Sequence, residues 1–157
     1  MKRFRPACAL FLLFLALFPL LPGCAAHPAP PEGEGALFSF LGEDFSRFAD
    51  GFSSAEVVRV QYCFTLDTPQ CVELTDPAII RQLFDALAQV EVAERTDIRA
   101  TDSEQSLRFM CRDGREFLFS FEGQALLRKG DAYQLTNDES LWALCQTLRR
   151  QTATANE

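Results

Sequence analysis

The sequence predicts an α+β domain of two layers, in which an antiparallel sheet of about five to six strands carries helices on one face. Three observations support this prediction. Several segments alternate apolar and polar residues and are separated by turn residues, which is typical of antiparallel strands. Other segments repeat apolar residues at helical spacing. The 15 phenylalanines, most of them in the later part of the chain, predict a dense apolar core.

The N-terminal segment has the three-part pattern of an export signal. Three basic residues near the start precede an almost wholly apolar run over residues 7–21. This run is too short for a comfortable membrane-spanning helix, and Pro19 and Pro22 break its end. We therefore expect the segment to direct the chain out of the cytoplasm.

The apolar run closes on Leu21, Pro22, Gly23 and Cys24, which resemble the lipobox of bacterial lipoproteins. Gly23 is the small residue before the cut, and Leu21 is the aliphatic residue three positions before the cysteine; Pro22 departs from the usual pattern. The resemblance implies a signal peptide over residues 1–23, cleavage between Gly23 and Cys24, and a lipid, with acyl chains such as palmitate, on the Cys24 sulfur. It implies anchoring at the extracytoplasmic face of the cell membrane. An ordinary secreted protein, cut at the alanine pair that follows, is the alternative.

We expect residues 24–35 to form the lipidated end and a tether, 36–150 a single domain, and 151–157 a flexible tail. Proline and glycine favour an extended tether. The only histidine, His27, lies in it, and a solvated position is favoured over a metal or catalytic role. Loss of the signal's three basic residues takes the formal net charge from −7 to −10. This acidity argues against nucleic acid and against an anionic membrane surface as partners.

The first predicted elements of the domain are a helix and two strands. Residues 36–52 place their apolar side chains on one helical face, although Gly42 weakens the helix. Residues 57–66 alternate as a half-buried strand, with Val58 inward at its start. Turn residues follow, and residues 71–74 return as a short strand.

Cys63 and Cys71 are predicted to face each other across these two strands. Matching the apolar faces places both cysteines on the outward face. If Tyr62 pairs with Val72, the two cysteines stand directly opposite, at a spacing compatible with a disulfide.

A second helix is predicted to start at Thr75, Asp76 and Pro77, which offer a capping side chain followed by a proline in the first turn, and to run to about residue 89. Residues 90–92 have the spacing of a strand start, and residues 95–104 read as a polar connection. Short strands over residues 125–128 and 132–135 continue the sheet. An acidic first turn then opens a final helix that runs to about residue 150.

The clearest hairpin spans residues 105–121. A two-residue turn at Asp113 and Gly114 would put the apolar residues of its two strands on opposite faces. A three-residue loop with Gly114 in the left-handed conformation instead pairs Phe109 with Phe117 and keeps both sets on one face. We predict the three-residue loop for this reason.

Cys111 and Cys145 are the other two cysteines that remain after the signal leaves and Cys24 is lipidated. Both are predicted to point inward, where they could form a second disulfide or stay as buried thiols. A redox site is disfavoured because there is no Cys-x-x-Cys motif. A four-cysteine zinc site is disfavoured because two cysteines point outward and two inward.

Residues 36–150 contain no histidine, which disfavours Ser-His-Asp and Cys-His catalysis and removes the commonest metal ligand. No glycine-rich phosphate loop or calcium-loop pattern occurs. Asp97, Asp102 and Glu104 lie near one another, but their spacing fits a solvated loop better than a cation site. We therefore predict no catalytic residue, no metal site and no cofactor.

These features favour a non-catalytic module that binds an envelope protein or a small ligand. The candidate binding face is the outward side of the sheet: Arg59, Gln61, Thr65, Glu73, Arg108, Arg112 and Glu116. One alternative is a small carboxylate-based hydrolase, which needs a pocket that holds two acids, one of them with a raised pKa. Another is an inhibitor of an extracellular enzyme, which would present the hairpin that carries Cys63 and Cys71.

Overall fold

The structure of the chain, a computed structural model, describes residues 35–65, 68–97 and 104–155, with side chains as far as residue 152. Gly33–Glu157 form one compact unit, and the fold below is that of this unit. The predicted signal peptide, its cleavage point after Gly23 and the lipidation site Cys24 lie outside the described residues.

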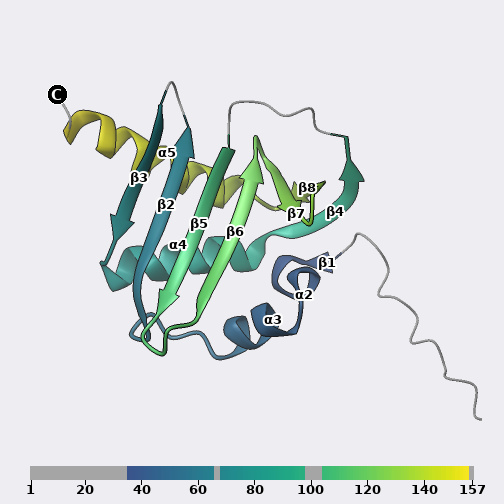
Figure 1. The fold of residues 1–157 in the computed structure, drawn as a ribbon, viewed down its shortest axis with the longest axis horizontal. Helices are drawn as coiled ribbons and strands as arrows, with labels where there is room; N and C mark the ends of the chain where they lie inside the picture. Colours follow the sequence, from purple (N-terminus) through teal and green to yellow (C-terminus); the bar gives the residue numbers. More distant parts are fainter. Residues whose placement is uncertain (1–34, 66–67, 98–103, 156–157) are drawn as a thin grey trace, which may run out of the picture. The chain divides into compact units, whose positions relative to one another are not determined.

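A single antiparallel sheet organises the unit (Figure 1). The described elements are β1 (Gly35–Ala36), α2 (Leu37–Leu41), α3 (Glu43–Asp50), β2 (Val57–Thr65), β3 (Pro69–Leu74), α4 (Pro77–Gln89), β4 (Glu91–Thr96), β5 (Glu104–Cys111), β6 (Glu116–Glu122), β7 (Ala125–Arg128), β8 (Asp131–Thr136) and α5 (Glu139–Ala155). The strand order is β1-β4-β8-β7-β6-β5-β2-β3. The predicted α+β class is confirmed, whereas the predicted five to six strands are wrong because the described sheet has eight.

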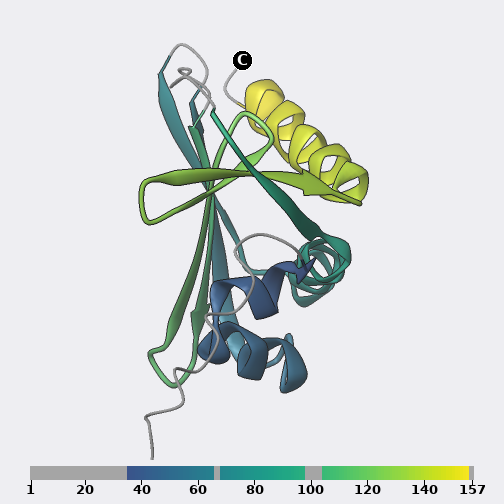
Figure 2. The same ribbon diagram turned by 90° about the vertical axis from the view of Figure 1, so that its right-hand side faces the viewer.

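The helices lie on one side of the strands β2, β5 and β6, and the other side of these strands is open (Figure 2). The same view shows the β7–β8 hairpin leaning toward the open side. We call the side of the sheet opposite the helices the open face.

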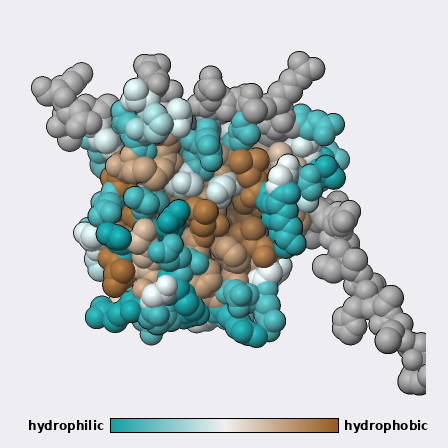
Figure 3. Space-filling view, in the orientation of Figure 1, coloured by the Kyte–Doolittle hydropathy of each residue, from teal (hydrophilic) through white to brown (hydrophobic). Residues whose placement is uncertain are grey.

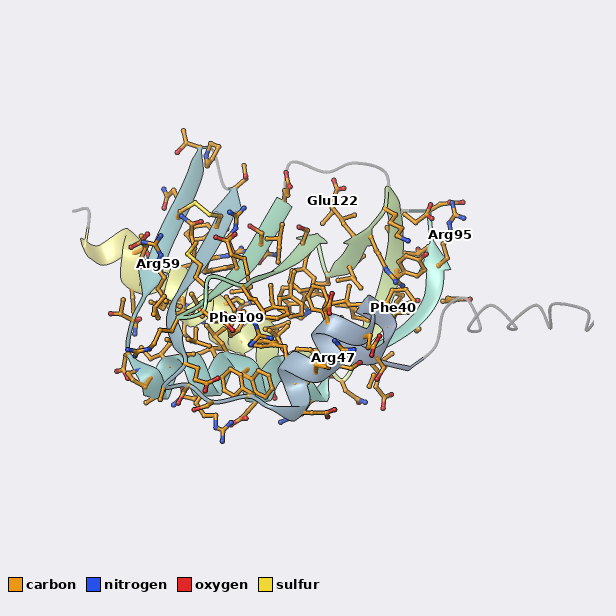
Figure 4. The ribbon with its side chains drawn as sticks, turned by 60° about the horizontal axis from the view of Figure 1, so that its bottom comes forward. Phe40, Arg47, Arg59, Arg95, Phe109 and Glu122 are labelled. Atoms are coloured by element: carbon orange, nitrogen blue, oxygen red, sulfur yellow. A yellow bond between two sulfur atoms is a disulfide. The ribbon has the colours of Figure 1, made fainter. Side chains whose placement is uncertain are left out.

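The core lies between the sheet and the helices and consists largely of phenylalanine. The Phe48 ring of α3 stacks on Phe117 with centroids 4.1 Å apart, and it meets Phe84 of α4 edge-on at 5.7 Å. Figure 4 shows Phe109 among these rings, and its side chain has no exposed surface. Burial of such rings supplies most of the force that holds the layers together, at roughly 25 cal/mol for each Å² removed from water.

The predicted first helix is divided in two at Gly42. This residue has a φ of 123°, which other residues rarely adopt, and it ends α2 before α3 begins at Glu43. The Ser46 hydroxyl donates a hydrogen bond of 3.3 Å to the Gly42 carbonyl oxygen and so helps to hold the junction. The break lets Phe38 and Phe48 both reach the core, with 6% of each side chain exposed.

Helix α4 begins and ends where the sequence predicts. Asp76 accepts a hydrogen bond of 2.8 Å from the Ala78 amide through Oδ1, and Pro77 occupies the first turn. The helix ends at Gln89, and β4 follows at once from Glu91.

The β5–β6 hairpin has the predicted three-residue loop. The Cys111 amide donates to the Arg115 carbonyl oxygen over 2.9 Å, and Gly114 has a φ of 86°. Phe109 pairs with Phe117, so both rings enter the core.

A β-bulge at the start of β2 changes which valine is buried. Val57 pairs with Cys111 and Arg59 pairs with Met110, so Val58 is the extra residue between them. Val57 is therefore 5% exposed and Val58 is 45% exposed, the reverse of the predicted alternation. The bulge places a large apolar side chain on the open face.

Helix α5 extends beyond the predicted domain end at residue 150. Residues 151–155, which we expected to form the start of a flexible tail, continue the helix to Ala155.

Candidate functional site

The open face carries the side chains that alternate with the buried ones on the long strands. Five of the seven predicted binding residues lie here as neighbours. Glu73 is opposite Gln61, Gln61 is opposite Arg108, and Arg59 and Glu116 both flank Met110.

The charges on this part of the face neutralise one another. Arg59 lies 3.2 Å from Glu73, and Arg108 lies 3.5 Å from Glu116. Arg59 also approaches the Met110 sulfur with Nε at 2.8 Å. Exposed ion pairs of this kind add at most about 1 kcal/mol each to stability. Their main effect is to leave a surface with no net charge across four strands.

An apolar patch accompanies these ion pairs. Val58 and Leu118 are the large hydrophobic residues with exposed side chains in the described part of the chain, at 45% and 44%. Leu118 is directly opposite Arg108, and Val58 adjoins Arg59 at the bulge. Figure 3 shows apolar surface over the middle of this face, bordered by hydrophilic side chains.

A row of small or uncharged residues crosses the open face beside this patch. Successive cross-strand partners define it, from β4 at one end to β3 at the other: Thr96, Ala132, Leu127, Ser120, Ser106, Cys63 and Cys71. A hollow of about 290 Å³ is lined by Thr96, Leu127 and Ala132, and another of about 250 Å³ by Ser106 and the two cysteines. The face is therefore recessed at both ends of the row.

The remaining two predicted binding residues lie at the ends of strands. Thr65 pairs with Pro69 beside the second hollow. Arg112 lies in the β5–β6 turn, where its Nη2 donates to the Ala55 carbonyl oxygen over 3.3 Å. Arg112 therefore ties the turn to the loop before β2 and does not join the other charged residues.

The Cys63–Cys71 disulfide is confirmed and lies on the open face. The two sulfurs are 2.03 Å apart, and the strands pair in the predicted register, with Tyr62 opposite Val72. The bond links edge strand β3 to β2 and so limits fraying of the sheet at this edge.

The second disulfide that was considered does not form, since Cys111 and Cys145 are free and buried. Cys145 lines a cleft together with Gln105, whereas Cys111 is six residues further along the same strand as Gln105. Six residues of extended chain span about 20 Å, far more than a disulfide can bridge. The two cysteines share an inward face but lie at opposite ends of it.

A polar chain of three side chains interrupts the apolar interior. Arg149 of α5 donates from Nε to the Tyr62 hydroxyl over 2.7 Å, and this hydroxyl donates to Gln105 Oε1 over 2.9 Å. Gln105 Nε2 donates in turn to the Gly123 carbonyl oxygen over 3.1 Å. Gln105 is the buried polar residue among those described, with 8% of its side chain exposed. These hydrogen bonds thus link helix α5, strands β2 and β5, and the β6–β7 turn.

The sequence analysis did not predict this series of hydrogen bonds. The alternation of Gln105 with Leu107, Phe109 and Cys111 was the available signal, because it places Gln105 on the inward face.

Burial favours the uncharged forms of Tyr62 and of the neighbouring Cys145. It raises the pKa of the Cys145 thiol to about 11, an effect that Tyr62 and Arg149 only partly offset. Burial also raises the pKa of the Tyr62 hydroxyl, and Cys145 adds to this shift, while Arg149 opposes it. At neutral pH both groups are therefore protonated.

Acidic side chains gather in the hollow between β4, β6 and β8. Asp97, Glu122 and Asp131 line it with Arg95, and Arg95 lies 2.6 Å from Asp131. Figure 4 places Arg95 at this side of the sheet, toward the edge. Within the described ranges, no three His, Cys, Asp or Glu side chains are arranged to hold a metal ion.

No family model, curated protein or solved structure matches this chain. None of the helices that the structure describes is long and apolar enough to cross a membrane.

Proposed function

We propose that this chain is a lipoprotein, anchored to the extracytoplasmic face of the cell membrane through Cys24, whose domain is a non-catalytic module that binds another envelope protein with its open face. The observation that carries the proposal is the uncovered apolar patch of Val58, Met110 and Leu118 beside balanced ion pairs.

The composition of the open face favours a folded protein as the partner. Protein interfaces combine an apolar centre with a polar rim, and charged residues are depleted at their centre. Leu118 and Val58 supply exposed apolar area, and the Arg59–Glu73 and Arg108–Glu116 pairs supply the rim. Since these charges are already balanced, the patch does not select for a strongly charged partner.

The disulfide supports an extracytoplasmic location. Disulfides persist in oxidising compartments and are rare where thiols are kept reduced. Cys63 and Cys71 form the bond on the exposed side of the sheet, where cytoplasmic reductants would have access.

A capture experiment with paired variants tests the binding face. The full chain carries an affinity tag and is purified from cross-linked cell envelopes as wild type, Leu118→Lys or Gln82→Lys. Gln82 is exposed on α4, on the helical side, so the control adds the same charge away from the open face. We expect Leu118→Lys to lose the captured protein and Gln82→Lys to keep it. Equal capture by both variants would remove the open face from the proposal.

The anchor is tested separately by Cys24→Ser. This change should abolish labelling by a radioactive fatty acid and release the chain from the membrane fraction. Labelling that persists in the variant would exclude Cys24 as the lipidation site.

A carboxylate-based hydrolase remains the second candidate, because one hollow holds Asp97, Glu122 and Asp131. Arg95 pairs with Asp131, and Glu122 lines the same hollow and is the residue that the test replaces. Hydrolysis of chromogenic esters or glycosides by the wild type, lost in Glu122→Gln, would favour an enzyme. The binding proposal expects no difference between the two.

A further inference from the structure

A cleft of about 210 Å³ opens beside α5, away from the residues of the apolar patch. It lies between this helix and the β6–β7 turn, and its walls come from Gln105, Gly123, Gln124, Trp142, Gln146 and Arg149, together with Cys145. The lining includes three glutamine amides and one arginine but no acidic side chain. The lining residues therefore carry a positive charge in a chain with a formal net charge of −7, while the Asp138 carboxylate accepts a hydrogen bond from Trp142 Nε1.

The Arg149 guanidinium supplies that charge, and within the described part of the chain no carboxylate lies within ion-pair distance of it. Its Nε–H donates to Tyr62, and its carbon lies 5.2 Å from the centre of the Phe64 ring. A guanidinium has five N–H donors in a planar fork that matches a carboxylate. The hydrogen bond at Nε and the ring contact orient the guanidinium, and among the described residues no hydrogen-bond acceptor is bound to its terminal nitrogens.

The groups beside Arg149 do not provide a counter-ion. The Tyr62 hydroxyl and the Cys145 thiol are both protonated at neutral pH, since their ordinary pKa values of 10.0 and 9.0 lie well above it and burial raises the pKa of each further. The Tyr62 hydroxyl donates a hydrogen bond to Gln105 Oε1, and Gln105 Nε2 donates one to the Gly123 carbonyl oxygen. The wall behind the guanidinium is thus neutral, rigid and fully hydrogen-bonded.

We propose that this cleft binds a small carboxylate that also carries an amide or hydroxyl group, with Arg149 as its counter-ion. The carboxylate accepts from the terminal nitrogens of Arg149, and the glutamine amides of Gln124 and Gln146 meet the second polar group. The cleft has room for about seven water-sized groups, which limits the ligand to a comparably small molecule. This inference is independent of the open face, so either proposal can fail alone.

Trp142 makes the binding measurable because it is the only tryptophan in the chain and lines the cleft. The probe is N-acetylglycine, a carboxylate with one amide, and its matched control is the neutral N-acetylglycinamide. Tryptophan fluorescence of the full chain in a mild non-ionic detergent is followed during titration at constant ionic strength. We expect a saturable change with N-acetylglycine, with Kd on the order of 1 mM, and none with the amide.

Three variants locate the site. Arg149→Met should weaken binding at least tenfold, whereas Arg150→Met, which removes the same charge from the next residue, should leave it unchanged. Gln146→Glu places a carboxylate in the cleft at an exposed position, so it should abolish binding by occupying Arg149 even if Arg149→Met does not fold. A response to the neutral amide equal to that of the acid, no response to either, or full binding by Gln146→Glu would overturn the proposal.

Discussion

The Tyr62 hydroxyl receives a hydrogen bond from Arg149 Nε and gives one to Gln105 Oε1, over 2.7 and 2.9 Å. The Tyr62 side chain, which belongs to β2, therefore joins helix α5 to the neighbouring strand β5. It also leaves no buried side-chain nitrogen or oxygen without a partner among the described residues. Loss of any member should cost more than the value of one hydrogen bond.

Tyr62→Phe should lower the free energy of unfolding by about 1–3 kcal/mol, because it leaves the buried Gln105 oxygen without a donor. Gln105→Leu should cost a similar amount, since the Tyr62 hydroxyl then lacks its acceptor. Urea unfolding of both single variants and of the double variant gives the coupling energy. We expect the double variant to be clearly more stable than additivity allows; strict additivity would show that the two groups are not linked.

Raising the pH should destabilise the fold between pH 9 and 11. The pKa of the Cys145 thiol rises from an ordinary 9.0 to about 11 on folding, so the folded state binds the proton more tightly. The contribution of this thiol to the free energy of unfolding is on the order of 2–3 kcal/mol. It is fully present below pH 9 and is lost as the pH rises through the pKa of the folded state. Urea unfolding at several pH values measures this loss. Cys145→Ala should reduce the slope, and the remaining slope comes from Tyr62 and Cys111, because burial raises the pKa of both groups as well. An identical slope in that variant would assign the effect to another group.

The disulfide should contribute about 2–3 kcal/mol, since it closes a loop with a sequence separation of 8. Residues 24–157 with Cys24→Ser are unfolded in urea with and without a reductant, beside the Cys63→Ala, Cys71→Ala double variant. Reduction should lower the unfolding midpoint of the parent to that of the double variant and leave the double variant unchanged. Equal midpoints for the oxidised and reduced parent would show that the bond adds no stability.

Cys111 and Cys145 should resist alkylation in the folded protein. Both are buried, and burial raises the pKa of both thiols, so little of the reactive thiolate is present near neutral pH. Mass spectrometry of residues 24–157 with Cys24→Ser, without reductant, should show no alkylated thiol when the protein is native and two after unfolding. Resistance that persists after unfolding, with a mass lower by two hydrogen atoms, would reveal a second disulfide.

Local patterns were sufficient to predict several features of the fold. The alternation of apolar residues placed Cys63 opposite Cys71, and the need to keep Phe109 and Phe117 on one face selected the β5–β6 loop. Both predictions depend only on neighbouring strands and on the turn that joins them, so no distant part of the chain is needed.

Features that depend on distant contacts were missed. The bulge at Val58 shifts the alternation by one residue, and only pairing with β5 shows where the shift occurs. Cys111 and Cys145 were assigned the correct face, but their positions along it depend on where α5 crosses the sheet. Arg149 acquired a candidate binding role only when α5 brought it to Tyr62 on a strand 87 residues earlier.

The most direct test of the binding proposal places a photo-reactive amino acid on the open face in living cells. The photo-reactive residue replaces Leu118 in one variant and Gln82, on the helical side, in the other. The proposal predicts a discrete cross-linked adduct from position 118 and none from position 82. No adduct from position 118, or equal adducts from both positions, would contradict it.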